Sequence, residues 1–208
     1  GLYRSTDGGV SWAESNFNPA TLGTGGLGHS FEIYKIAYHP TIPNKVLIGT
    51  DQGLYVSNDN LQTWARPLSS GDITNVVFHP TDPNVIYVYD NRSSNGNRNY
   101  VFRSVDAGTT FNLAGNMSGN SNTGGGYFSV SADCPDCLYF ASDAGVWKSL
   151  DQGSSFTFMT NPSEECDGFA VNDMDTSKMI YGYVDLMAST NGGQSFDQVT
   201  WWALGNSN

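Results

Sequence analysis

The stretch Ser104-Val-Asp106-Ala-Gly108-Thr-Thr110-Phe111 decides the fold of this chain, because it occurs five times in closely similar form. The other copies begin at Ser5, Ser57, Ser149 and Ser189, and consecutive copies start 52, 47, 45 and 40 residues apart. A period of about 40–50 residues is that of a four-stranded propeller blade. The repeat therefore predicts an all-β chain, a β-propeller of four-stranded antiparallel blades.

Each residue type in the repeat has a part in forming a tight turn. An aspartate two residues after the serine can accept backbone N–H groups and lock the turn. Glycine supplies a positive φ, and the closing Trp or Phe begins the next strand and packs into the core. Leu61 replaces the glycine in the second copy. The predicted turn-locking residues are Asp7, Asp59, Asp106, Asp151 and, with an amide in place of the carboxylate, Asn191.

The segments between the repeats predict one partial propeller over residues 1–208. Residues 1–16 supply the last two strands of one blade, and four complete blades cover residues 32–67, 73–113, 127–159 and 168–200. About four and a half blades would leave an exposed sheet edge at each end, which native proteins avoid. We therefore expect the chain to be covalently part of a longer polypeptide.

The composition of the chain agrees with many short strands and excludes two classes of partner. The 208 residues include 24 glycines, with 13% aromatic and only 14% charged residues, which suits strands joined by frequent turns. The formal net charge of −11 would repel phosphate backbones and anionic lipids, so we expect no nucleic-acid partner. No apolar run approaches the ~20 residues of a membrane helix, so we expect no membrane insertion.

The connections between strands predict where a ligand would bind. Two sets of turns are short and repetitive, whereas the connections at the other end of the sheets, residues 13–31, 90–99, 114–126 and 161–167, vary in length. Binding sites normally lie on such variable loops. An aspartate near the end of each second strand could bind a cation or act as an acid or base, but the recurrence favours turn capping. The candidate ligand face comprises Asp51, Asp90, Asp143 and Asp185, with Arg92, Arg98, Tyr127, Trp201 and Trp202, which the repeat does not match. The two tryptophans are either a sugar-stacking or partner surface or buried core.

The histidines and cysteines have predicted structural roles. His39 and His79 occupy one repeated position before proline, which is typical of a turn. Cys134 and Cys137 stand where other blades have His-Pro-Thr. A redox role would need a βαβ context and zinc would need four ligands, so we predict a disulfide that clamps the turn, without a metal or cofactor. Cys166 is predicted to be free or to pair outside the chain.

Three phrases carry a resemblance to a known group of proteins. Gly1-Leu-Tyr-Arg-Ser-Thr-Asp-Gly-Gly9, His39-Pro-Thr-Ile-Pro-Asn44 and His79-Pro-Thr-Asp-Pro-Asn84 resemble the Asp-box (BNR-type) propellers of the sortilin-like and xyloglucanase-like group. Large secreted bacterial surface proteins contain similar runs. The resemblance covers nearly the whole chain and implies an extracellular or cell-surface location. It does not define the function, because such propellers occur in sialidases, glucanases, sorting receptors and adhesins.

Three functions compete on this basis. The absence of a catalytic signature favours an extracellular binding or interaction module for a protein or glycan ligand, with no catalytic residue assigned. The alternative is a glycoside hydrolase of the xyloglucanase-like type. The resemblance to that type implies paired aspartates across two propellers. A sialidase is disfavoured, because the Arg-Ile-Pro motif of that family is absent and few arginines lie outside the repeat. The third function is a structural spacer in an adhesin.

Overall fold

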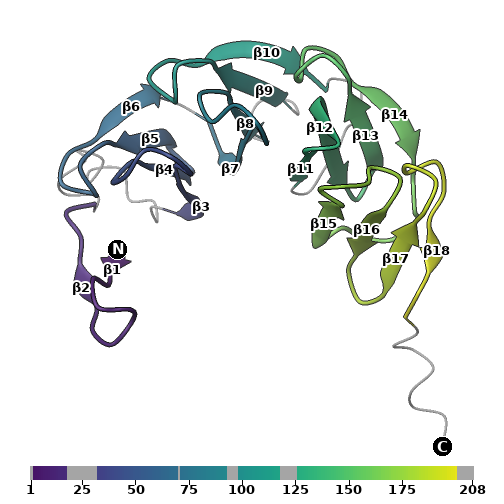
Figure 1. Ribbon diagram of the computed structural model, residues 1–208, viewed down its shortest axis with the longest axis horizontal. Coiled ribbons are helices and arrows are strands. Elements are labelled where there is room, and N and C mark those ends of the chain that lie inside the picture. Colours follow the sequence, from purple (N-terminus) through teal and green to yellow (C-terminus); the bar gives the residue numbers. More distant parts are fainter. Residues whose placement is uncertain (1, 18–31, 70, 93–97, 118–125, 201–208) are drawn as a thin grey trace, which may run out of the picture.

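The computed structural model describes residues 2–17, 32–69, 71–92, 98–117 and 126–200. Within these residues the chain is all-β, with one two-stranded sheet and four four-stranded antiparallel sheets and no helix that could span a membrane. The sheets follow one another along an open arc, with the N-terminal strands at one end and β18 near the other (Figure 1). The fold is therefore a partial β-propeller.

The strand bounds define a half blade and four complete blades. The half blade holds β1 (Tyr3–Arg4) and β2 (Ala13–Glu14). Blade 1 holds β3 (Ile33–Tyr38), β4 (Val46–Thr50), β5 (Gly53–Ser57) and β6 (Ala65–Leu68). Blade 2 holds β7 (Ile73–Phe78), β8 (Ile86–Arg92), β9 (Arg98–Ser104) and β10 (Asn112–Asn116). Blade 3 holds β11 (Tyr127–Ser131), β12 (Cys134–Ser142), β13 (Gly145–Ser149) and β14 (Thr157–Thr160). Blade 4 holds β15 (Gly168–Val171), β16 (Met179–Gly182), β17 (Leu186–Ser189) and β18 (Asp197–Gln198).

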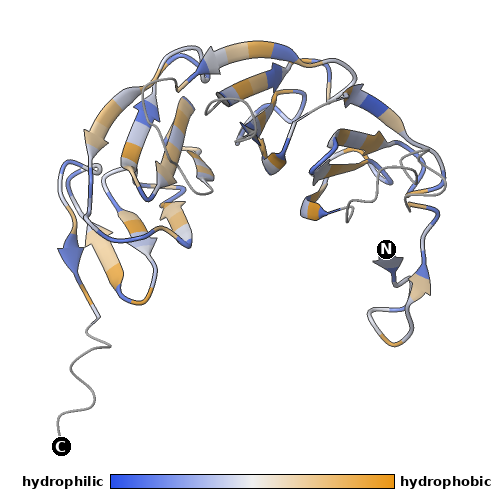
Figure 2. Ribbon diagram, turned by 180° about the vertical axis from the view of Figure 1, so that it is seen from behind, coloured by the Kyte–Doolittle hydropathy of each residue, from blue (hydrophilic) through white to orange (hydrophobic). Residues whose placement is uncertain are grey.

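Each complete blade is an antiparallel meander in chain order. Its first strand lies on the inner side of the arc and its fourth strand on the outer side (Figure 1). The first-to-second and third-to-fourth turns therefore lie at one end of the sheets, which we call the turn end. The second-to-third turns and the connections between blades lie at the other, which we call the loop end. Hydrophobic residues lie mainly on the strands, and the connections are largely hydrophilic (Figure 2).

The repeated turn is held by hydrogen bonds within seven residues. Ser104 Oγ donates to Asp106 Oδ1 at 2.7 Å and accepts the Gly108 N–H at 2.8 Å. The Asp106 carboxylate accepts the Thr110 N–H at 2.9 Å and the Thr110 hydroxyl at 2.6 Å. The side-chain and backbone hydrogen bonds from Thr110 lower the pKa of Asp106 to about 2. Equivalent bonds form at Asp7, Asp59 and Asp151.

The two copies that depart from the repeat keep the turn by other means. Leu61 adopts a φ of 73°, a region that suits glycine, but its side chain is buried in a hydrophobic cluster and its N–H still bonds Ser57 Oγ at 2.9 Å. Asn191 accepts the Ser195 N–H at 3.1 Å, and its Nδ2 donates to Ser195 Oγ at 2.8 Å. The bond to the hydroxyl thus runs in the reverse direction, as an amide requires.

The core lies between neighbouring blades. One apolar cluster joins Leu47 and Leu54 of blade 1 to Ile73 and Ile86 of blade 2, and further clusters join the other neighbours in the same way. The backbones of neighbouring blades approach most closely at two glycines. An added Cβ on Gly49 would lie 2.3 Å from the carbonyl oxygen of Ile73, and one on Gly115 would lie 2.2 Å from the carbonyl oxygen of Gly153. Neighbouring sheets therefore touch through side chains at most positions and through bare backbone at these two glycines.

The structure differs from the predicted strands at two kinds of position. Residues 90–99 were predicted as a variable loop, but β8 continues to Arg92 and β9 begins at Arg98, because the ladder extends through the pairs Asn91↔Asn99 and Arg92↔Arg98. The fourth strands begin later than predicted. In blade 1, Thr63 still binds Asp59 through its N–H and hydroxyl, so β6 starts only at Ala65.

Replacing Asp106 by Asn tests the turn carboxylate. The folded pKa of about 2 lies below the ordinary 3.8, so the stabilisation is present above pH 4 and is lost as the pH falls towards 2. At neutral pH we expect Asp106→Asn to destabilise the chain by about 1 kcal/mol, at the low end for hydrogen bonds to a charged group because the turn is exposed. Thermal unfolding as a function of pH should show the difference from the unmodified chain shrinking below pH 4. A difference independent of pH would contradict this.

Replacing Gly49 by Ala tests the contact between blades 1 and 2. The new methyl group would overlap the Ile73 carbonyl, so we expect a loss of about 1–3 kcal/mol in the free energy of unfolding. Gly168→Ala is the matched control, because Gly168 is also a strand residue with an ordinary φ but has nothing within 4 Å of an added Cβ. The control should change stability by less than about 0.5 kcal/mol in denaturant titrations. Equal effects of the two substitutions would refute the steric explanation.

Candidate functional site

The four aspartates of the candidate ligand face lie at the loop end. Asp51, Asp143 and Asp185 lie in the turns between the second and third strands of blades 1, 3 and 4, and Asp90 lies near the end of β8. They do not share one blade position. In blade 2, Asp90 pairs with Ile73, the first residue of the first strand. In blade 1 the corresponding partner of Ile33 is Thr50, so Asp51 lies one residue further along the chain than the counterpart of Asp90.

Each of these carboxylates binds a neighbouring segment of the chain. Asp51 Oδ1 accepts the N–H of Glu32 at 3.1 Å, and Asp90 Oδ1 accepts the N–H of Asp72 at 3.0 Å. Asp143 Oδ1 accepts the N–H of Cys166 at 2.8 Å, which lies in the connection to the next blade. In blade 4, Asp185 accepts hydrogen bonds from the side chains of Gln198 and Thr200. All four aspartates therefore hold the loop end in place.

A tyrosine between blades 1 and 2 is surrounded by carboxylates. Tyr34 on β3 is 41% exposed, and its hydroxyl donates to Glu32 Oε2 at 3.0 Å. Burial of the ring edge, this hydrogen bond and the negative charges of Glu32, Asp72 and Asp51 raise the pKa of Tyr34 well above its ordinary value. An exposed aromatic face beside fixed hydrogen-bond acceptors can stack on a ligand ring and bind its hydroxyl groups.

A second tyrosine with acidic neighbours lies between blades 3 and 4. Tyr127 is half-buried on β11, and burial followed by the charge of Asp167 and, more weakly, of Asp143 raises its pKa. Sequence reasoning selected Tyr127 and Asp143 but missed Asp167. It also missed Tyr34, Glu32 and Asp72. A signal was available, because an acid directly precedes the first strand in three of the four blades.

The remaining candidates of the ligand face are strand residues at the loop end or lie outside the described residues. Arg92 and Arg98 form the last pair of the β8–β9 ladder at the loop end, so the prediction that they lie within a loop is wrong, although they lie at the predicted end of the sheets. Trp201 and Trp202 lie outside the described residues. Cys166 is a buried free thiol at the loop end, and burial raises its pKa to about 12, which keeps it protonated and unreactive at neutral pH.

The turn end carries structural polar groups. His39 Nδ1 accepts the N–H of Ile42 at 3.0 Å, and His79 Nδ1 accepts the N–H of Asp82 at 3.1 Å. Cys134 and Cys137 form a disulfide with Cα atoms 5.3 Å apart, at the start of β12. These groups close the turns from the first to the second strand, so the turn end offers little variation from blade to blade.

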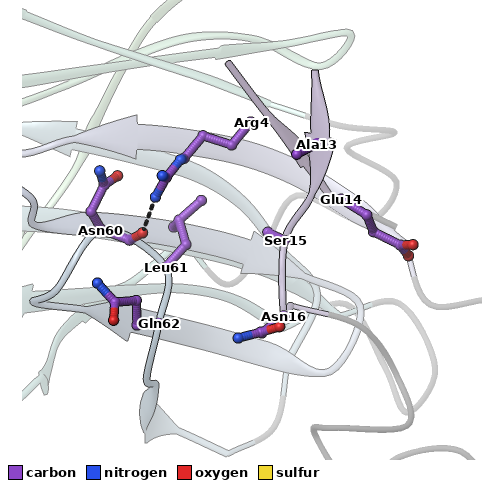
Figure 3. Close-up of a pocket in the computed structure, with 8 residues that line it drawn as sticks. All are labelled: Arg4, Ala13, Glu14, Ser15, Asn16, Asn60, Leu61 and Gln62. Carbon is purple, nitrogen blue, oxygen red and sulfur yellow. Dashed lines mark hydrogen bonds between the residues drawn. The ribbon is translucent and has the colours of Figure 1, made fainter. Parts of the chain in front are cut away.

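A small polar pocket lies between the half blade and blade 1 (Figure 3). It has a volume of about 170 Å³, and the Arg4 guanidinium enters it and donates to the carbonyl oxygen of Asn60 at 2.8 Å. The Glu14 side chain points away from Arg4 (Figure 3). The pocket therefore presents a cation and amides but no acid–base pair. Among the described residues, no three His, Cys, Asp or Glu side chains are grouped so that they could hold a metal ion.

Comparison with known proteins gives one match in sequence and several in structure. No known protein-family profile matches the chain. The chain is 27% identical over 191 residues to a probable oligoxyloglucan-reducing end-specific xyloglucanase of Neosartorya fischeri. That match covers 79% of the chain and 23% of the xyloglucanase, so the chain spans about a quarter of the length of this curated relative.

The solved structures share the fold at low sequence identity. An ancestral GH74 enzyme matches 96% of the chain and 28% of its own length, with a TM-score of 0.76 and 20% identity. YCF48 bound to D1 peptide matches 95% of the chain and 61% of its own length, with a TM-score of 0.62 and 17% identity. These similarities establish the propeller fold.

Proposed function

We propose that this chain is one arc of an extracellular, glycan-acting propeller of the xyloglucanase type. The observation that carries the proposal is the sequence match to a xyloglucanase, which extends over most of the chain and agrees with the structural match to a GH74 enzyme. The binding module favoured by the sequence has less support, because the match in sequence is to a glycan-cleaving enzyme.

The loop end supplies chemistry that suits a neutral polysaccharide. Tyr34 and Tyr127 offer aromatic surface, and the carboxylates beside them can accept hydrogen bonds from sugar hydroxyl groups. The net charge of −11 would repel an anionic glycan but not an uncharged one. The ligand in this proposal is therefore an uncharged β-glucan such as xyloglucan.

We assign substrate binding, and not proton transfer, to this arc. Glycoside hydrolysis requires two carboxyl groups that flank the bond to be broken, about 5–9.5 Å apart. Here Asp51, Asp90 and Asp143 accept backbone N–H groups that hold neighbouring loops, and Glu32 accepts the Tyr34 hydroxyl. These carboxylates are already committed to positioning the loop end.

The location and the repeat class belong to the same proposal. The disulfide Cys134–Cys137 suits an oxidising compartment outside the cell. The five turns each have a serine and a closing hydroxyl, with an aspartate in four and Asn191 in the fifth, and they support membership of the Asp-box propellers. Residues 1–208 would then be consecutive blades of a longer propeller.

A peptide-binding module is the second candidate function. It is favoured by the structural match to YCF48 bound to D1 peptide, which covers nearly the whole chain and more than half of that protein. The same exposed tyrosine and carboxylates at the loop end would then contact a peptide, with the acidic groups selecting basic residues.

Xyloglucan oligosaccharide binding measured by isothermal titration calorimetry tests the glycan proposal. We expect Tyr34→Ala to weaken binding about tenfold, since one stacked ring contributes on the order of 1 kcal/mol. Tyr38→Ala is the matched control, because Tyr38 lies on the same strand, is also exposed and stands at the turn end. Xyloglucan binding by the Tyr38→Ala variant should be unchanged.

The outcomes separate the candidate functions. Binding that Tyr34→Ala weakens and Tyr38→Ala does not would support the loop-end site. No binding of xyloglucan by the unmodified chain would refute the glycan proposal. Binding of a basic peptide panel at the same tyrosine, without xyloglucan binding, would favour the peptide module instead.

A further inference from the structure

The polar pocket between the half blade and blade 1 has its walls on two neighbouring sheets. One wall is β2 with the two residues that follow it, the other is the repeat turn of blade 1 from Asn60 to Gln62, and Arg4 of β1 lies between them. In each complete blade the third strand separates the fourth strand from the first two. Any first and second strands of the half blade would therefore pair with the edge of β1 opposite β2, on the inner side of the arc. The pocket lies on the outer side at the turn end, so it does not result from where the chain begins.

Arg4 brings a positive charge into this pocket, and no described carboxylate pairs with it. The half-buried guanidinium donates one hydrogen bond, from Nη1 to the carbonyl oxygen of Asn60 at 2.8 Å, and the described residues form no ion pair with it. A guanidinium has five N–H donors, so most of its donors remain for a ligand. Glu14 also lines the pocket, but its carboxylate points away from Arg4 (Figure 3).

An arginine at the same repeat position between blades 2 and 3 has a different environment. Arg103 also directly precedes the serine of its repeat, and it donates from Nη1 to Gln152 Oε1 at 3.0 Å. Gln152 Nε2 in turn donates to Asp136 Oδ1 at 2.6 Å, and the N–H of Gln152 binds the carbonyl oxygen of Asp136. In blade 1 the corresponding N–H, that of Asn60, binds the carbonyl oxygen of Asn44, so a neutral amide stands in the place of Asp136. The interface between blades 2 and 3 thus supplies a carboxylate, whereas the interface around Arg4 does not.

The pocket adds neutral hydrogen-bonding groups to this cation. The side-chain amides of Asn16 and Gln62 line it, one from the half blade and the other from blade 1 (Figure 3). Ser15 Oγ accepts the N–H of Phe17 at 3.2 Å, so its own hydroxyl hydrogen can be donated to a ligand. The volume of about 170 Å³ is close to that of an engineered cavity of ~150 Å³ that holds one six-membered ring. The site therefore suits a single ring that carries one carboxylate and several hydroxyl groups.

We propose that this pocket binds a single uronic acid unit, with its carboxylate paired to Arg4 and its hydroxyl groups bound by Ser15 and the two amides. Arginine binds a carboxylate through two parallel N–H···O bonds, which a neutral sugar cannot form. The net charge of −11 repels a polyanion as a whole, so the ligand is one acidic unit, such as the end of a branch, and not a polyuronic acid. The inference goes beyond the proposed function, because this pocket lies at the turn end and the proposed xyloglucan site lies at the loop end.

The test is a titration of the 208-residue chain with D-glucuronate, followed by the chemical shifts of the backbone amides in NMR spectra. D-Glucose is the matched neutral ligand, and acetate is the carboxylate alone. We expect glucuronate to bind with a dissociation constant on the order of 1 mM, and glucose and acetate each to bind about tenfold or more weakly. The shifts should centre on residues 13–16 and 60–62. Arg4→Gln should weaken glucuronate binding about tenfold or more, and added salt should weaken it as well.

Arg103→Gln is the matched control, because Arg103 holds the same repeat position but lies at an interface that already supplies a carboxylate. It should bind glucuronate like the unmodified chain, and circular dichroism checks that both variants fold. Glucuronate binding that Arg4→Gln leaves unchanged, or shifts confined to other residues, would overturn the proposal. Glucose or acetate binding as tightly as glucuronate would refute the assignment of an acidic sugar. An unmodified chain that does not bind glucuronate would overturn the proposal as well, whatever the outcome with xyloglucan.

Discussion

The constraint on which the structure depends is the carboxylate clamp of the repeated turn. One oxygen of Asp106 holds a backbone N–H and the other holds a hydroxyl four residues along the chain, while the serine binds the aspartate and a further N–H. The two bonds from Thr110 are exposed and contribute little stability by themselves, whereas the bond from the Gly108 N–H to Ser104 is buried. Their joint effect is on direction, because they set the angle at which the third strand leads into the fourth. The aromatic residue that follows the turn is thereby placed between two blades.

The core that results is a row of interfaces between nearest neighbours. Each apolar cluster draws its side chains from adjacent blades, and Gly49 and Gly115 permit the closest approaches of neighbouring sheets. A structure of this kind has no centre in the sense of a globular domain, so its stability is a sum over blades and over the contacts between them. The same property leaves the end blades with apolar faces that the interior blades do not show.

The chemistry at the loop end depends on this stacking. Tyr34 from one blade and Asp72 from the next become neighbours only because the blades are packed side by side, and Tyr127 and Asp167 are related in the same way. The aspartates in the turns hold these segments in place through backbone N–H groups. A rigid scaffold thus presents a row of tyrosines and carboxylates, an arrangement that would suit an extended, uncharged ligand.

The sequence by itself determined the fold class, the spacing of the blades and the chemistry of the turns. These are local properties, since every hydrogen bond of the turn joins residues at most four positions apart and the period can be counted. It also located the aspartates at 51, 90, 143 and 185, but not the N–H groups that they bind. Only the tertiary structure decided that Tyr34 lies among acids of two blades, that β8 and β9 continue their ladder to Arg92 and Arg98, and that Leu186 is exposed where Leu54 is buried. These outcomes depend on contacts between strands and blades far apart in the chain, and no local pattern encodes which neighbour a given face will meet.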